Sequence, residues 1–177
     1  MSSRTTIRPV PEWADRVGHL IPLLVLPSGM WRLGVAFGFS MGVLDAAGHP
    51  AHVHGLEAVG IGSLTLISEL VALTAFGLVR PWGEVVPGWI PLIGGRRVAP
   101  YAAIMPAVLG SLALMAIWTF TVFGFSDMSF SSPWLFALML ACYLPLHLWG
   151  PLLLLLTWAY HRRRGLEAPI TATVGAA

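Results

Sequence analysis

The fold of this chain is decided by residues 100–124, PYAAIMPAVLGSLALMAIWTFTVFG, and by residues 134–160, WLFALMLACYLPLHLWGPLLLLLTWAY. The first stretch contains no Asp, Glu, Arg or His, and the second contains only His147 from that group. The hydrocarbon core of a bilayer is about 30 Å thick and needs about 20 apolar residues in a helix to cross it. We therefore expect each stretch to form a membrane-spanning helix.

Two earlier stretches are apolar around a single charge. Residues 17–44 surround Arg32, and residues 58–80 surround Glu69. If either charge ended its segment, the remaining pieces of roughly 10 to 15 residues would be too short to cross a bilayer. We therefore predict an all-α polytopic membrane protein, a single domain over residues 1–177, with four transmembrane helices at 17–44, 58–80, 100–124 and 134–160 and short tails at 1–16 and 161–177.

The composition excludes most classes of soluble protein. Apolar residues make up 56% of the chain and charged residues 10%, whereas soluble domains carry about 25% charged residues. The net charge is only +2, and no basic stripe interleaves with aromatics as nucleic-acid binding requires. The single Cys142 excludes a disulfide framework. No nucleophile motif or phosphate-binding loop occurs, so an enzyme is the least favoured interpretation.

The arginines predict the orientation. Nine of the ten lie in the two tails or in the segment from residue 80 to residue 99, and the tenth is Arg32. The intervening segments 45–57 and 125–133 contain no Lys or Arg. Because basic residues concentrate on the cytoplasmic side of membrane proteins, we expect both termini in the cytoplasm and the chain in the bacterial plasma membrane.

Three ionisable residues are predicted at a similar depth, near the middle of the bilayer: Arg32, Glu69 and His147. A lone charge there costs at least ~2.5–3.5 kcal/mol, so such residues face the bundle interior and find partners. We expect an Arg32–Glu69 ion pair with His147 within reach and Tyr143 on the same helix face. This midplane polar cluster either fixes the register of the helices or binds or conducts a substrate, and the sequence leaves both open.

Three glycines in the first predicted span make two successive GxxxG steps, at Gly34, Gly38 and Gly42. Small residues at this spacing let a second helix approach closely. We therefore expect a helix-packing face here, used within the chain or by a second copy.

Three histidines, His49, His52 and His54, follow the first span with Asp45 and Glu57 on either side. Three imidazoles and a carboxylate are enough ligands for a divalent metal such as Zn²⁺ or Cu²⁺, and the imidazoles titrate near neutral pH. The loop is a candidate metal or pH sensor, and the alternative is a solvated loop that merely contains histidines.

Residues 81–91 read PWGEVVPGWIP and are followed by Gly95-Arg96-Arg97-Val98. This loop resembles one in small, uncharacterised four-span integral membrane proteins of actinobacteria. The resemblance covers the loop and the order of the spans around it, about half of the chain. It implies a four-helix multi-pass membrane protein and carries over no activity, cofactor or catalytic residue.

Three functions are compatible with these patterns. The favoured one is a non-enzymatic accessory or scaffold component of a membrane assembly, whose partners are the lipid bilayer and either a second copy or another membrane protein. The second is a small carrier or a proton or cation pathway through Arg32, Glu69 and His147. The third is a metal- or pH-responsive sensor that uses the histidine loop.

Overall fold

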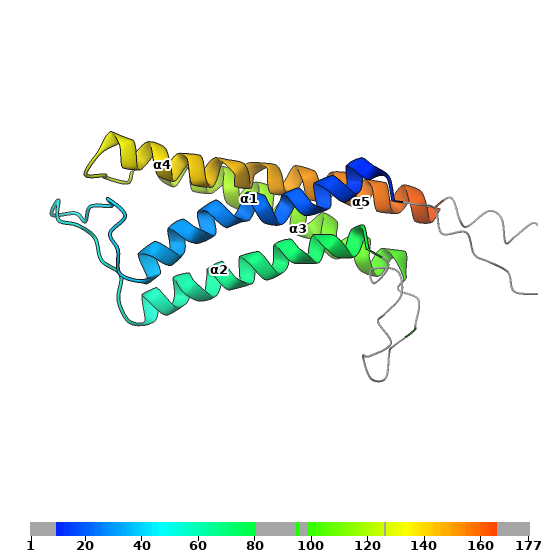
Figure 1. Cartoon of the computed structure of the whole chain (residues 1–177), viewed down its shortest axis with the longest axis horizontal. Coiled ribbons are helices and arrows are strands. Elements are labelled where there is room, and N and C mark those ends of the chain that lie inside the picture. Colours follow the sequence, from blue (N-terminus) through cyan, green and yellow to red (C-terminus); the bar gives the residue numbers. More distant parts are fainter. Residues whose placement is uncertain (1–9, 81–94, 96–98, 126, 166–177) are drawn as a thin grey trace, which may run out of the picture.

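Four helices are long and apolar enough to cross a membrane in the computed structural model of this protein, which describes residues 10–80, 95, 99–125 and 127–165. In chain order they are α1, Glu12–Ala36; α2, Leu56–Thr74, extended by the 3-10 turn η1, Ala75–Leu78; α3, Pro100–Phe125; and a fourth helix made of α4, Pro133–Tyr143, η3, Leu144–Leu148, and α5, Trp149–Gly165 (Figure 1). The described residues contain no β-strand beyond two isolated bridges. The predicted all-helical, four-span architecture is therefore confirmed at this level.

The first helix differs most from its predicted bounds. It begins at Glu12 and ends at Ala36, whereas the apolar pattern predicted 17–44. Glu12 and Asp15 are acidic residues in its first turn, where the helix dipole favours negative charge. After Ala36 the backbone φ angles of Gly38 (+87°), Met41 (+50°) and Gly42 (+81°) are positive, and a right-handed helix cannot continue through such residues. Hydropathy did not reveal this end because the residues beyond it are still apolar.

The fourth helix changes geometry in the middle. Residues Leu144–Leu148 form a 3-10 segment between α4 and α5. Pro145 accounts for the change, because proline has no N–H to donate and its ring displaces the carbonyl one turn earlier. At the start of α4, the Ser132 hydroxyl accepts a hydrogen bond of 3.3 Å from the Trp134 amide, which is the usual role of serine at a helix N-cap.

The helices pack in an open order. α1 lies along α2 and contacts α5, and α3 lies along α5. The core between them includes Ile21, Leu146, Leu156 and Tyr160, whose side chains are almost completely buried. In the 18-residue apolar stretch of each span, only 17% of the residues of the second span and 11% of those of α3 are buried, against 33% for α1 and 28% for the fourth helix. In the described part of the chain α2 and α3 have almost no contact with each other. The bundle is therefore not closed between α2 and α3.

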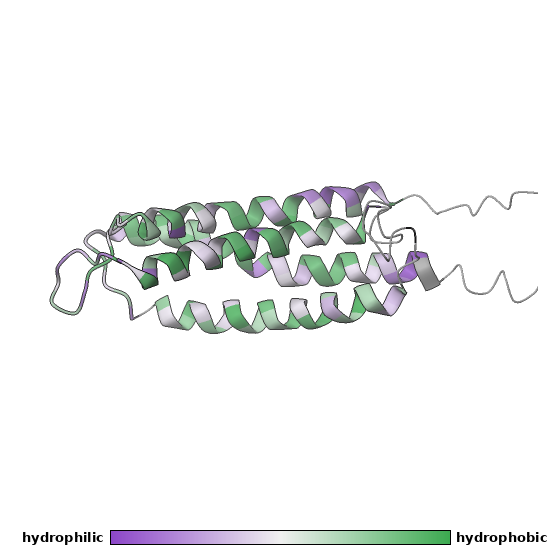
Figure 2. Ribbon diagram, turned by 90° about the horizontal axis from the view of Figure 1, so that it is seen from below, coloured by the Kyte–Doolittle hydropathy of each residue, from purple (hydrophilic) through white to green (hydrophobic). Residues whose placement is uncertain are grey.

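Hydropathy follows the long axis of the bundle. Hydrophobic residues cover most of each helix, and hydrophilic residues gather at the end where α1 begins and α5 finishes (Figure 2). Those two ends lie on the same side of the molecule, opposite the loop between α1 and α2 (Figure 1). Such a distribution is what a bundle crossing a bilayer requires.

The three glycines of the predicted packing face do not share one helix, although a Cβ on Gly42 would collide with Leu135 of α4. Only Gly34 lies in α1, because the helix ends before Gly38 and Gly42, and a Cβ on Gly34 would lie 3.0 Å from the sulfur of Met41. Close contacts between helices also occur at two other glycines. A Cβ on Gly150 of α5 would lie 2.9 Å from the Ser111 carbonyl oxygen of α3, and one on Gly29 of α1 would lie 3.0 Å from Oε1 of Glu69. The GxxxG spacing failed as a signal because it presumes a helix that is not present.

The loop after α1 is tied to the loop before α4. The Leu44 amide donates to the Ser129 carbonyl (2.9 Å), and the Ser131 amide donates to the Gly42 carbonyl (2.8 Å). These bonds hold residues 37–55 over the end of the bundle. Of the predicted loop motif in residues 81–98, only Gly95 is among the described residues, so the motif lies essentially outside them.

Candidate functional site: a cavity at the loop end of the bundle

Arg32 is the most unusual side chain in the bundle. Its residue surface is only 7% exposed, although arginine is almost never fully buried without a partner. Nε donates a hydrogen bond of 3.2 Å to Oγ1 of Thr65 on α2. The Thr65 hydroxyl in turn donates to the carbonyl of Ile61 in its own helix, at 2.9 Å. The guanidinium is therefore oriented by α2 from one side.

The predicted ion pair between Arg32 and Glu69 is not formed. Among the described residues, no contact at ion-pair distance joins these two side chains. Glu69 instead places Oε1 over Gly29, one turn of α1 before Arg32. Both Oε1 of Glu69 and Nη2 of Arg32 are buried and have no hydrogen-bond partner among the described residues. The two charged side chains thus lie in the same contact between α1 and α2, about one helical turn apart along it.

The displacement follows from the true end of α1. Arg32 lies four residues before Ala36, the last residue of the helix, which is about 6 Å along its axis. The prediction put Arg32 near the middle of a span that continued to residue 44. Because α1 stops earlier, Arg32 lies near the loop end and meets Thr65 instead of Glu69.

His147 does not join this cluster. It lies in η3, halfway along the fourth helix, and its Nδ1 lies 3.3 Å from the Leu144 carbonyl of its own turn. In the described part of the chain no hydrogen bond or ion pair links it to Arg32 or Glu69. Tyr143, one turn nearer the loop end, lines the same cavity as Arg32. Of the four predicted cluster residues, the structure therefore brings Arg32 and Tyr143 together.

The Arg32 cavity, as we name it, has a volume of about 400 Å³. Its walls come from the end of α1, the loop after it, the start of α2, and α4. Four polar residues line it, Arg32, Ser40, Glu57 and Tyr143, and the other lining residues are apolar: Trp31, Val35, Val43, Ala51, Val53, Ile61, Met128 and Met139. Sequence reasoning missed this site, because five of its lining residues lie in loops, which carry no periodic signal: Ser40, Val43, Ala51, Val53 and Met128.

The histidine loop is ordered by its own contacts. His49 lies 4.0 Å from the carboxylate of Asp45, His52 places Nδ1 2.8 Å from the Gly38 carbonyl, and the rings of His52 and His54 stack with centroids 6.2 Å apart. The described residues contain no group of three or more His, Cys, Asp or Glu side chains placed to hold a metal. Metal binding by His49, His52 and His54 stays a prediction.

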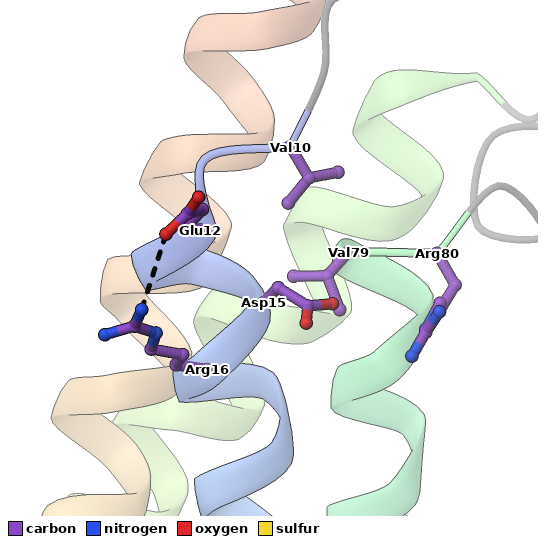
Figure 3. A pocket seen from close by; sticks show the side chains of 6 residues that line it. All are labelled: Val10, Glu12, Asp15, Arg16, Val79 and Arg80. Atoms are coloured by element: carbon purple, nitrogen blue, oxygen red, sulfur yellow. Dashed lines mark hydrogen bonds and ion pairs between the residues drawn. The ribbon is translucent and has the colours of Figure 1, made fainter.

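The opposite end of the bundle carries a charged hollow of about 470 Å³, shown in Figure 3. Asp15 of α1 and Arg80, just after η1, point toward it from two helices, and the Glu12–Arg16 pair closes one side at 3.4 Å. The Glu12 and Arg16 side chains are 90% and 81% exposed, and exposed pairs contribute little energy. We interpret this hollow as a solvated helix end.

His19 links the two helices at this end. Nη2 of Arg80 donates to Nε2 of His19 at 3.3 Å, since arginine cannot accept a hydrogen bond. Nδ1 of His19 therefore carries the proton that is donated to the Asp15 carbonyl, at 2.8 Å. The contact fastens the start of α1 to the end of α2.

A third hollow lies where the bundle is open. The α2–α3 groove has a volume of about 690 Å³ and an almost wholly apolar lining, to which Leu153 of α5 contributes between the two helices. Nearly half of its lining residues are glycine or alanine: Gly77, Ala102, Ala103, Ala107, Gly110 and Ala113. The small side chains keep the backbone of α3 accessible along the groove.

No protein-family model, no curated protein and no solved structure matches this chain.

Proposed function

We propose that this chain is a non-enzymatic, multi-pass protein of the bacterial plasma membrane that serves as an accessory or scaffold component of a membrane assembly. The observation that supports the proposal is the α2–α3 groove. Two membrane-length helices that bury little of their own surface flank a hollow lined by small residues. Helix association in membranes depends on such small residues, because they allow close van der Waals packing. A transmembrane helix therefore fits the groove.

The occupant we propose is a second copy of this chain. Most oligomers are symmetric, and a twofold dimer forms each of its contacts twice. The apolar side chains of Leu66 and Leu70 on α2 are exposed, and α2 is one wall of the groove, so α2 of each copy can enter the groove of the other. A single twofold interface would then fill the α2–α3 groove of each copy.

The test compares two substitutions in the same helix. A Cβ at Gly110, in the groove, or at Gly124, outside it, meets no atom within 4 Å, so leucine at either position is compatible with the fold. We expect the wild type and Gly124→Leu to be dimeric in lipid nanodiscs by mass photometry, and Gly110→Leu to be monomeric. A monomeric wild type, or a dimer unaffected by Gly110→Leu, would reject self-association through this groove. If the wild type is monomeric and lipid remains bound in the groove, the occupant is an acyl chain and not a second copy.

The carrier hypothesis has one supporting observation. Arg32 and Glu69 each bury an atom without a hydrogen-bond partner among the described residues, and buried charges in a membrane protein commonly mark a pathway. Flux of a proton or small ion in proteoliposomes should then be lost in Glu69→Gln, while the thermal unfolding temperature is retained. Equal flux in the wild type, the variant and empty liposomes would reject it.

The sensor hypothesis is tested by calorimetry. If the loop binds metal, titration with Zn²⁺ or Cu²⁺ gives a binding isotherm that disappears when His49, His52 and His54 are all changed to alanine. The absence of binding to the wild type would reject the hypothesis.

A further inference from the structure

The Arg32 guanidinium is incompletely satisfied. A guanidinium has five N–H donors and no acceptor. In this structure Thr65 accepts a hydrogen bond from Nε of Arg32, while Nη2 is buried and has no hydrogen-bond partner among the described residues. A buried charged donor without a partner is costly, more so than a neutral one. The side chain is held in place by α2 and borders the Arg32 cavity, from which an acceptor can approach the guanidinium.

The acceptor that matches a guanidinium best is a carboxylate, since its two oxygens fit two parallel N–H donors. Arg32 is one of the residues that line the Arg32 cavity, and so is Tyr143, whose hydroxyl is both a donor and an acceptor. Glu69 directs Oε1 over Gly29, and this oxygen has no hydrogen-bond partner among the described residues. A carboxylate supplied by a ligand is therefore the group that the inner end of the cavity recognises.

The rest of the lining selects the body of the ligand. Eight of the lining residues are apolar, including Trp31, Val53 and Ile61, and the volume of about 400 Å³ is within the range of about 300–1,000 Å³ found for small-molecule sites. Such a wall favours a hydrocarbon or aromatic body over a sugar or a phosphate ester. Binding then removes apolar surface from water.

Glu57 places a negative charge at the end of the cavity away from Arg32. It lies in the first turn of α2 and is exposed, and it stands eight residues before Thr65, or about 12 Å along the helix axis. A second negative charge on the ligand, directed away from Arg32, would face this carboxylate. A positive charge at the same place would be attracted to it.

We propose that the Arg32 cavity binds a small apolar monocarboxylate, with its carboxylate on Arg32 and Tyr143 and its body against the apolar wall. Glu57 discriminates against dicarboxylates. The site is independent of the α2–α3 groove, so its failure leaves the proposed assembly role intact.

The probe is para-fluorobenzoate, observed by fluorine NMR with the full-length protein in lipid nanodiscs and with empty nanodiscs as the background. We expect saturable binding to the wild type and a loss of affinity of about tenfold or more in Arg32→Gln, which removes a charge-assisted hydrogen bond. Tyr143→Phe should weaken binding about three- to tenfold. The absence of saturable binding beyond that of empty nanodiscs, or equal affinity in the wild type and Arg32→Gln, would overturn the proposal.

A second pair of variants guards against misfolding of Arg32→Gln. Ile61→Trp fills the cavity and keeps Arg32, whereas Ile67→Trp places the same bulk on the exposed side of α2, where Ile67 is 57% exposed. We expect binding to be lost only in Ile61→Trp, with both variants folded by circular dichroism. Equal binding by the two variants would place the probe outside the cavity and refute the site.

The specificity follows from competition. Benzoate and para-(aminomethyl)benzoate should displace the probe, and terephthalate, which carries a second carboxylate, should do so poorly. In Glu57→Gln the ratio of the affinities for benzoate and terephthalate should decrease by about threefold or more. Equal displacement by benzoate and terephthalate in the wild type would contradict the role of Glu57.

Discussion

Arg32 donates from Nε to Oγ1 of Thr65 at 3.2 Å, across the contact between the last turns of α1 and the middle of α2. This hydrogen bond takes the place of the ion pair with Glu69 that the sequence predicted. The Arg32 side chain also lines a cavity near the loop end of the bundle. The candidate site of the protein follows from this one choice of partner.

Replacement of Thr65 tests the bond. In Thr65→Val we expect a loss of unfolding free energy of about 1–2 kcal/mol, because a hydrogen bond to a charged group is removed within the bundle. Thr119→Val is the matched control, since the Thr119 hydroxyl makes the same bond to its own helix (2.7 Å to the Met115 carbonyl) and is exposed. The free energy of unfolding of both variants is measured by titration with a denaturing detergent. Equal losses of unfolding free energy in the two variants would show that the hydrogen bond from Arg32 to Thr65 does not stabilise the fold.

The close contact of α5 with α3 depends on Gly150. A Cβ there would lie 2.9 Å from the Ser111 carbonyl and closer still to Met115, so Gly150→Ala should cost about 1–3 kcal/mol through overpacking. The same change at Gly124, which has open space around it, should be neutral or stabilise the helix by up to about 1 kcal/mol. Thermal unfolding in detergent gives the comparison, and a stabilising effect of Gly150→Ala would refute the contact.

Arg163 fastens α5 to the end of the second span. Its Nη2 donates to the carbonyl of Leu78, the last residue of η1, at 2.6 Å. In Arg163→Gln we expect faster hydrogen exchange at the amides of Val79 and Arg80, which bond to the Phe76 carbonyl in this turn, because the turn loses its restraint. Arg162→Gln is the control, because Arg162 stacks on Trp158 of its own helix. Unchanged exchange in Arg163→Gln would show that the turn is held by other contacts.

Asp45 organises the histidine loop. Its Oδ1 accepts hydrogen bonds of 2.9 Å from the amides of Ala47 and His49. Asp45→Ala should broaden or shift the amide resonances of these residues, and Asp45→Asn should restore them, because an asparagine side chain keeps an acceptor oxygen for the same turn. Nuclear magnetic resonance of the labelled protein is the measurement. Identical spectra for the alanine variant and the wild type would mean that the turn forms without the side chain.

The sequence predicted some elements better than others, for reasons visible at individual residues. α3 was placed almost correctly because its apolar run begins and ends at polar or turn-forming residues. The end of α1 was missed because Phe37, Phe39 and Met41 continue the apolar pattern after the helix has stopped. The positive φ at Gly38 cannot be recognised from hydropathy, because glycine is also common inside membrane helices.

The candidate site was predicted in part. Arg32 and Tyr143 were selected from charge and helix spacing, and both line the cavity. His147 was selected by the same reasoning, but it lies one turn further along the fourth helix and bonds within its own turn. Ser40, Val53 and the other loop residues of the wall were not foreseen, because a loop has no repeating geometry from which to place its side chains.

The sequence by itself determined that four helices are long and apolar enough to cross a bilayer, because that property depends on the composition of each segment and on the need to satisfy its own backbone hydrogen bonds. Only the tertiary structure decided where α1 ends, that Arg32 meets Thr65 and not Glu69, and that the loop closes a cavity around the guanidinium. Those outcomes depend on which turns of two helices face each other. A shift of a single turn, about 5.4 Å, replaces one partner by another without changing the hydropathy of either helix.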